Sequence, residues 1–145
     1  MTPPARPVAL IAGASGLVGR QLLRLLLDDP GWAQVHALVR RPLGIAHPHL
    51  VEHVHDFDDL DRARLPAADA AFCCLGTTIK VAGSQPAFRK VDHDYVLAFA
   101  RLAQRVGARH LAVVSAMGAN ARSPVFYNRV KGETEQDLRA LGLPS

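Results

Sequence analysis

Three glycines at three-residue spacing, directly after an apolar run, constrain this fold more than any other feature of the sequence. The run is Val8–Ala12, and the glycines are Gly13, Gly16 and Gly19. In a strand that turns sharply into a helix, the first glycine allows the tight turn and the second lets a ligand approach the backbone. The third lets the helix pack closely on the sheet. Because a helix N-terminus offers unpaired N–H groups and partial positive charge, the motif predicts a pyrophosphate site; a glycine-rich turn without a ligand is the alternative.

Apolar runs and helix-like segments alternate along the rest of the chain, which is typical of a parallel sheet covered by helices. The expected strands are Val8–Ala12, Val35–Val39, Val51–His55, Ala70–Leu75 and Leu111–Ser115, and the expected helices are Leu17–Leu27, Gln85–Val106 and Val125–Leu141. The sequence therefore predicts an α/β fold, a Rossmann-type doubly wound parallel sheet of about five strands in the order 3-2-1-4-5. We expect residues 1–145 to form a single NAD(P)-binding domain, truncated at the C-terminus before its substrate-binding part.

Composition narrows the class of protein. The 145 residues suffice for one domain, and 49% of them are hydrophobic. The net charge is +4, but the basic residues are scattered and do not alternate with aromatics, so nucleic-acid binding is not expected. No apolar run reaches the roughly 20 residues that span a membrane, and the Pro-rich start does not resemble a secretory signal. With Cys73 and Cys74 adjacent in an expected strand and therefore facing apart, we expect reduced thiols and a cytoplasmic protein.

The end of the second expected strand indicates which dinucleotide binds. NAD-selective domains place an acid there, whereas this strand ends at Val39 and continues with Arg40 and Arg41. A guanidinium can bracket a 2′-phosphate with charge-assisted bonds and stack on adenine, so the sequence predicts NADP(H), with Arg40 as the main contact. Two solvated arginines at a loop start are the alternative. The other expected cofactor contacts are Ser15, Leu17, Val18, Asp56, Phe57, Leu75, Gly76 and Thr77.

A second cluster lies about a hundred residues downstream. Ser115 ends an expected strand, and Tyr127 and Lys131 follow as Tyr-x-x-x-Lys, one helical turn apart on the same face. A phenol beside an ammonium can exchange a proton with a carbonyl or alcohol oxygen, and a serine hydroxyl can hold that oxygen. We expect Ser115, Tyr127 and Lys131 to be catalytic, and Tyr127 and Lys131 also to contact the cofactor. A core aromatic and a solvated lysine are the alternative.

Together these residues resemble the short-chain dehydrogenase/reductase superfamily in its atypical extended branch. In particular, the chain is similar to NAD(P)-binding oxidoreductase-like proteins related to the human Tat-interacting protein. The matching segments are the glycine loop, Cys74-Leu75-Gly76-Thr77-Thr78, Val91-Asp92-x-Asp94-Tyr95-Val96, Ser115-x-x-Gly118-Ala119 and Tyr127-x-x-x-Lys131-Gly132-Glu133. The resemblance implies that Ser115, Tyr127 and Lys131 are a catalytic trio of an oxidoreductase or an epimerase/dehydratase-like enzyme. One departure is Val130, where the extended branch usually has serine.

The histidine-rich segment near His53 and the aromatic Tyr95 are both expected to have structural roles. Histidines and acids at His47, His49, Glu52, His53, His55 and Asp56 could suggest a metal site, but they fall on an edge strand whose polar side chains face water, so no metal is expected. Tyr95 fits the apolar stripe of the long expected helix, so packing is favoured over catalysis. That helix and the last one often pair with a symmetry mate in the superfamily, which is compatible with a homodimer.

The leading hypothesis is therefore an NADP(H)-dependent oxidoreductase that transfers hydride between the nicotinamide and an unidentified small carbonyl or alcohol substrate, with Tyr127 as the acid/base. The alternative is a non-catalytic NADP(H)-sensing module that binds a protein partner.

Overall fold

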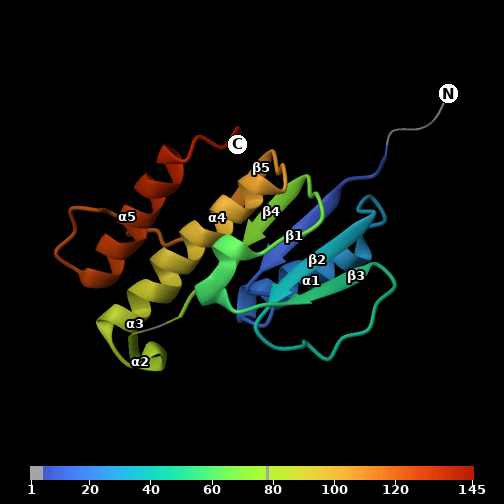
Figure 1. The fold of residues 1–145 in the computed structure, drawn as a ribbon. Helices are drawn as coiled ribbons and strands as arrows, with labels where there is room; N and C mark the ends of the chain where they lie inside the picture. The colour runs from blue at the N-terminus through green and yellow to red at the C-terminus, as the bar shows by residue number, and fades with distance from the viewer. Residues whose placement is uncertain (1–4, 78) are drawn as a thin grey trace.

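A computed structural model describes residues 5–77 and 79–145, so Thr78 of the Cys74–Thr78 motif lies outside the described residues. Its centre is a parallel sheet of five strands in the order β3-β2-β1-β4-β5, which confirms the predicted topology (Figure 1). The strands are β1 (Val8–Ala12), β2 (Gln34–Val39), β3 (Leu50–Val54), β4 (Ala70–Cys73) and β5 (His110–Val113). Because all five run the same way, their carboxyl ends meet at one edge of the sheet.

Helices cover both faces of this sheet. In chain order they are α1 (Leu17–Asp28), η1 (Phe57–Arg62), α2 (Ile79–Ala82), α3 (Gln85–Arg89), η2 (Lys90–Tyr95), α4 (Val96–Arg105) and α5 (Phe126–Ala140). Helix α1 lies on one face, and α4 lies on the other with α5 beside it (Figure 1).

Each face has its own hydrophobic core, and β1 contributes to both. Ala9 and Ile11 pack with Leu23 and Leu26 of α1, whereas Leu10 and Ala12 belong to the larger core formed with η1 and α4. Alternate side chains of a strand point to opposite faces, so a central strand buried on both sides must be apolar throughout. This requirement explains the uninterrupted apolar run before the first glycine.

The long helix expected from Gln85 to Val106 is divided in the structure. Helix α3 ends at Arg89, η2 is a π-helical turn over Lys90–Tyr95, and α4 continues from Val96. The predicted uniform helix is therefore wrong in its middle, because apolar spacing does not distinguish an α-helix from one with a single widened turn. Such π turns are rare and frequently occur at functional sites.

Strands β4 and β5 end earlier than predicted, which places Leu75 and Ser115 in loops beyond them. Only the next amide of each strand, that of Cys74 and of Val114, still bonds to the neighbouring strand, at 2.9 Å and 3.0 Å. After β4 the chain leaves the sheet at Cys74, because the turn at Gly13 lies against the Cys74 backbone. Both shifted residues still lie at the carboxyl edge.

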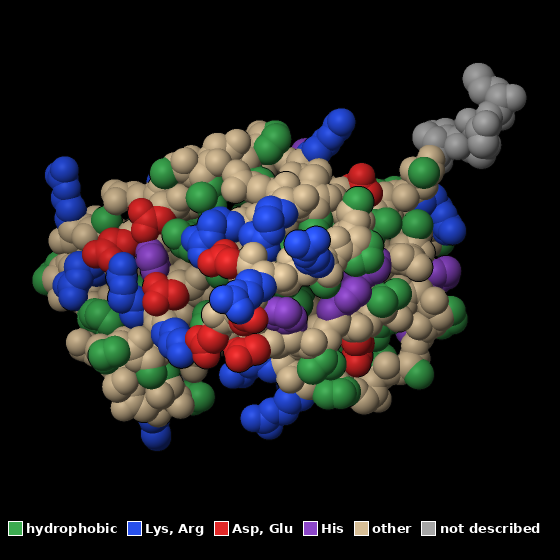
Figure 2. All heavy atoms as spheres, in the orientation of Figure 1, with side chains coloured by type: hydrophobic (Ala, Val, Ile, Leu, Met, Phe, Trp, Pro, Cys, Tyr) green, Lys and Arg blue, Asp and Glu red, His purple; other side chains and the backbone are tan. Residues whose placement is uncertain are grey.

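Charged side chains of both signs are interspersed over the face formed by α4, α5 and η1 (Figure 2). Ion pairs connect η1 to its neighbours: Arg101 of α4 lies 3.1 Å from Asp61, and Lys90 of η2 lies 2.8 Å from Asp58. Within the described residues, no helix combines the length and apolar character needed to cross a membrane.

Candidate functional site

A cavity of about 550 Å³ opens at the carboxyl edge of the sheet, where β1, β2 and β4 end. Open α/β sheets bind their ligands at this position, and the volume lies within the usual range of ligand pockets. Eight of the predicted cofactor contacts line it: Gly13, Ser15, Gly16, Arg40, Arg41, Phe57, Leu75 and Gly76. The remaining lining residues are Ala14, Arg20, Leu38, Val39, Pro42, Leu43, Ile45, Cys74, Val91 and Tyr95.

The glycine loop forms the floor of this cavity. Gly13 has a φ of 81°, a left-handed conformation that disfavours other residues, and a Cβ there would lie 2.4 Å from the carbonyl carbon of Cys74. A Cβ on Gly19 would lie 1.9 Å from the carbonyl oxygen of Gly13, so the third glycine allows α1 to approach the loop. Gly16 begins α1 without a side-chain cap. The helix therefore presents its first amides and its positive dipole end to the cavity.

Three arginines lie along the same cavity. Arg40 and Arg41 follow β2 as predicted, and Arg20 joins them from α1. The sequence interpretation missed Arg20, although it lies one helical turn after Gly16 and its amide bonds to the Gly16 carbonyl at 2.9 Å. The cavity thus combines backbone amides, a helix N-terminus and guanidinium groups, which are all groups that bind phosphate.

Other predicted cofactor contacts lie outside the lining of this cavity. Leu17 and Val18 have exposed fractions of 78% and 52%, and Val18 lines a second, apolar groove of about 340 Å³ between α1, β4 and β5. Gly19 is buried behind the loop. Asp56 accepts a hydrogen bond from the Asp58 amide at 2.9 Å and so caps η1. The Thr77 amide donates to Asp92 Oδ2 at 3.1 Å.

Lys131 is buried and bound to a carboxylate that the sequence interpretation did not connect with it. Its Nζ forms a short ion pair with Asp92 Oδ1, and the exposed fractions of the two residues are 6% and 1%. Asp92 belongs to η2, and its carbonyl also accepts a hydrogen bond from Thr134 Oγ1 at 3.2 Å. The cluster adjoins the cavity, because Gly76 and Val91, the neighbours of Thr77 and Asp92, line it.

Tyr127 lies with Lys131, as the Tyr-x-x-x-Lys spacing predicts. The Lys131 ammonium is 5.6 Å from the centroid of the Tyr127 ring, and the centroids of the Tyr127 and Phe88 rings are 5.4 Å apart. Ser115 Oγ is buried but has no hydrogen-bond partner among the described residues, so it bonds to neither Tyr127 nor Lys131. A buried hydroxyl without a partner is costly and is available to a ligand.

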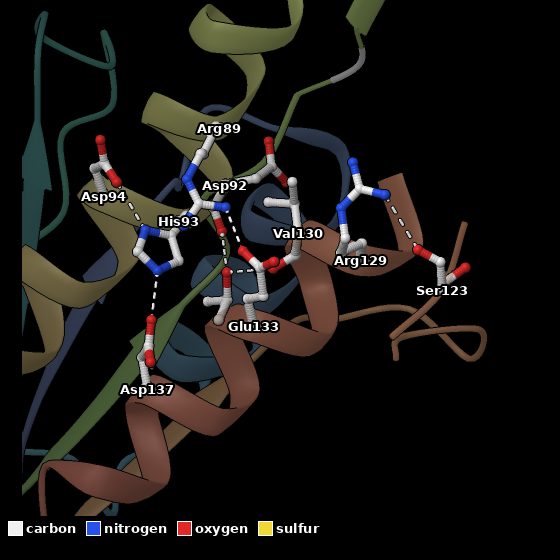
Figure 3. A network of polar contacts seen from close by, with 10 residues as sticks. Arg89, Asp92, His93, Asp94, Ser123, Arg129, Val130, Glu133 and Asp137 are labelled. Carbon is white, nitrogen blue, oxygen red and sulfur yellow. Dashed lines mark hydrogen bonds and ion pairs between the residues drawn. The ribbon is translucent and has the colours of Figure 1, made fainter. Parts of the chain in front are cut away.

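Polar contacts hold α5 against α3 and η2 (Figure 3). Arg89 and Glu133 form an ion pair of 2.6 Å, and His93 lies between Asp94 and Asp137, with each ring nitrogen 2.7 Å from a carboxylate oxygen. In addition, the absence of a side chain at Gly132 lets the preceding loop approach α5 closely. The helix that carries Tyr127 and Lys131 is therefore held both by these polar contacts and by that loop.

Burial and hydrogen bonding perturb several groups near the cavity. Burial raises the pKa of Cys73 to about 12, and burial also raises the pKa of Cys74. Both cysteines are free, as expected. Tyr95, which lines the cavity and donates to Asp58 at 2.9 Å, has its pKa raised mainly by burial and then by that carboxylate. Tyr95 and the thiols are therefore neutral at physiological pH.

The predicted histidine-rich segment does not form a metal cluster in the part of the chain that the structure describes. His53 Nε2 is instead 2.7 Å from His36 Nδ1, and the rings stack at a centroid distance of 5.0 Å. His55 lies beyond the end of β3 and is 3.1 Å from the Asp59 carbonyl.

Comparison with known proteins identifies the family. The NAD(P)H-binding family model matches residues 13–143, so the chain belongs to this family of NAD(P)-binding, oxidoreductase-like Rossmann proteins.

Relatives support the same family. The chain is 38% identical over 136 residues to Protein HTATIP2 from Rattus norvegicus, and the matched region covers 90% of this chain and 56% of the relative. It is 37% identical over 134 residues to the mitochondrial protein FMP52 from Eremothecium gossypii, covering 92% and 60%. The chain therefore spans somewhat more than half the length of these relatives.

Solved structures confirm the fold. MoeE5 in complex with UDP-glucuronic acid and NAD superposes with a TM-score of 0.73 at 20% identity, over 91% of this chain and 48% of that one. The human epimerase family protein SDR39U1 with NADPH gives 0.66 at 19% identity, over 91% and 48%. At such low identity these similarities establish the fold alone.

The relatives overturn one expectation. The cytoplasmic location predicted from composition is contradicted, because FMP52 proteins from several yeasts, at 32–37% identity, are named mitochondrial. Composition failed here because it describes the folded domain and carries no information on the compartment to which that domain is delivered.

Proposed function

We propose that the chain is the NADP(H)-binding part of an oxidoreductase that reduces a carbonyl group or oxidises the corresponding alcohol. This proposal rests on one observation: the same cavity is lined by the glycine loop and by the two arginines after β2. A pyrophosphate fits the amides at the start of α1, where Gly16 leaves the backbone open: a Cβ there would have its nearest neighbour at 3.5 Å. Phe57, Leu75 and Tyr95 supply apolar surface for the flat rings.

The preference for NADP(H) over NAD(H) rests on Arg40 and Arg41. Neither is buried, and both line the cavity at the end of β2, where an acid would select the unphosphorylated ribose. Calorimetric titration tests this preference. We expect NADPH to bind at least about tenfold more tightly than NADH, since charge-assisted bonds contribute about 1.5–3 kcal/mol.

Arg40→Ala should remove most of that difference by weakening NADPH and leaving NADH nearly unchanged. Arg139→Ala is the matched control, because Arg139 is an exposed arginine in the last turn of α5. Equal affinity of the wild-type protein for both dinucleotides would contradict the NADP(H) assignment.

Proton transfer is proposed for Tyr127. A bound dinucleotide would supply hydride to the carbonyl carbon and be oxidised as that carbon is reduced. Tyr127 Oη gives its proton to the carbonyl oxygen, so the product is an alcohol, and solvent then returns a proton to the phenolate. Ser115, whose hydroxyl has no protein partner among the described residues, donates to the same oxygen and stabilises its developing charge.

Tyr127→Phe separates this mechanism from a binding module without catalysis. The ring and its contact with Phe88 are kept, so NADPH should bind with a Kd within about threefold of the wild-type value, while turnover of a carbonyl substrate falls at least about a hundredfold. The assay uses a panel of small aldehydes and ketones and the oxidation of NADPH. Unchanged turnover in the variant would refute the role of Tyr127; NADPH binding without turnover in either protein would favour a sensing module.

A further inference from the structure

We infer that Asp92 is a positioning residue that neutralises Lys131, so that Tyr127 experiences a paired, net-neutral lysine and remains a protonated hydrogen-bond and proton donor. This inference rests on the proton-transfer role proposed above for Tyr127. It adds a counter-charge to Lys131, which the sequence interpretation considered only as an ammonium beside the phenol of Tyr127.

The first observation is how completely the pair is enclosed. The side chain of Asp92 has an exposed fraction of 0% and that of Lys131 one of 8%. Charges removed from water attract each other strongly and are weakly screened, so this contact defines where the ammonium lies. The other carboxylate oxygen accepts from the Thr77 amide, which connects the lysine to the loop after β4.

The second observation is the position of Tyr127 relative to this pair. The Lys131 ammonium lies over the face of the Tyr127 ring, 5.6 Å from its centroid. An unpaired ammonium at such a distance favours the ionised form of a neighbouring acid, whereas a carboxylate bound to that ammonium opposes the effect. With Asp92 in place, Lys131 acts through its location and its remaining N–H donors more than through its charge.

The third observation is that several other charged groups around this part of α5 are also paired with an opposite charge (Figure 3). The pairs are Arg89 with Glu133, and His93 with Asp94 and Asp137. Cys73, which interacts electrostatically with both members of the ion pair, is neutral because burial raises its pKa to about 12. Arg129 donates to the Ser123 carbonyl at 3.2 Å. It is unchanged in every variant compared below, so its charge does not contribute to the differences between them. Asp92 is thus the group whose removal changes the charge next to Tyr127 most directly.

A spectroscopic titration tests the inference without cofactor or substrate. The chain contains two tyrosines, so Tyr95→Phe leaves Tyr127 as the one phenol in the protein. In this background, alkaline titration followed by phenolate ultraviolet absorbance reports Tyr127 alone, with circular dichroism recording that the fold persists. We expect Asp92→Asn, which keeps the shape but removes the charge, to move the titration midpoint to lower pH by at least about one unit. A smaller displacement would overturn the inference.

A double variant decides the question even if Asp92→Asn does not fold. Asp92→Asn/Lys131→Met removes both charges, and replacing a buried pair as a whole is tolerated far better than breaking it. If the pair is net neutral in the wild-type protein, the midpoint of the double variant stays within about one pH unit of the Tyr95→Phe reference. A rise of more than that would show that Lys131 acts as an uncompensated cation, which contradicts the inference.

The outcome is independent of whether the chain binds NADP(H). A protein without measurable affinity for NADPH could still give the expected displacement, and a protein that binds NADPH tightly could fail to give it. The pH profile of carbonyl reduction supplies the functional readout: Asp92→Asn should lose activity at a lower pH than the wild-type protein does.

Discussion

The two halves of the site treat their polar groups in opposite ways. Around the glycine loop, backbone amides and three arginines surround an open cavity. Around Lys131, the polar groups are buried and bound to one another, and Asp92 contacts both the loop after β4 and helix α5. The first region presents uncompensated positive groups to an open cavity, whereas the second carries its own counter-charge.

Because of this difference, substitutions in the two regions should affect different properties of the protein. Removing a group from the cavity should change affinity and leave folding nearly intact, since that group contacts solvent or ligand. Removing a group from the buried cluster leaves an uncompensated partner, so its first effect is on the free energy of unfolding.

The largest effect is expected from breaking the buried pair. Asp92→Ala leaves the Lys131 ammonium and the Thr77 amide without their acceptor, and should lower the free energy of unfolding by about 3–5 kcal/mol. Urea denaturation followed by circular dichroism measures the loss. Asp92→Leu/Lys131→Met, which removes both charges, should recover most of it. A loss below about 1 kcal/mol in the single variant would show that the pair is accessible to water.

Two glycines of the same loop should separate stability from affinity. Gly19→Ala places a methyl group against the Gly13 carbonyl, so it should lower the free energy of unfolding by about 1–3 kcal/mol and weaken NADPH binding. Gly16→Ala has room in the folded chain and should cost less than about 1 kcal/mol while still obstructing the phosphate. Thermal denaturation and calorimetry distinguish the two. Unchanged NADPH affinity in Gly16→Ala would argue against a pyrophosphate on this loop.

A smaller effect is expected from the arginine that the sequence interpretation missed. Arg20→Ala should weaken NADPH about three- to tenfold, because an exposed guanidinium contributes roughly 1 kcal/mol to an anion nearby, and the loss should shrink as salt is raised. Arg24, also exposed on α1 but outside the cavity lining, provides the control: Arg24→Ala should bind NADPH like the wild-type protein. Equal losses in both variants would indicate a general charge effect.

The smallest expected effect lies at the β2–β3 edge, away from both halves of the site. Burial, and for His36 also the neighbouring ring, lowers the pKa of His36 and His53 below 6.5. The unfolded chain therefore binds more protons than the folded one just below that value, so stability is full above pH 6.5 and falls as the solution is acidified. His53→Asn should flatten this part of the stability profile, measured by urea denaturation between about pH 5 and 8. An unchanged slope would assign the effect to other groups.

Much of the fold follows from local rules. The run Val8–Ala12 and the three glycines predict β1, the turn and α1, because a doubly buried strand and a tight approach leave few other residue choices. The strand order also follows from the alternation of elements and is confirmed. The π turn was missed because apolar spacing continues through it, and one extra residue in a turn leaves no periodic signal.

The site divides in the same way. Arg40 and the glycine loop are adjacent to strand ends, so their place at the cavity could be predicted from sequence position. The contact between Asp92 and Lys131 joins residues 39 positions apart and depends on how η2 packs on α5. One signal was present: Asp92 lies four residues after Phe88 and three before Tyr95, so a carboxylate occupies the apolar stripe of the expected helix and requires a buried partner.

An amide chemical-shift titration of the isotopically labelled protein shows residue by residue whether NADPH binds in the glycine-loop cavity. We expect saturable shifts that are largest in three of the segments that line the cavity, which are Gly13–Gly16, Arg40–Leu43 and Cys74–Gly76. Absence of saturable shifts, or shifts confined to the apolar groove lined by Leu22, Leu25 and Val114, would contradict it.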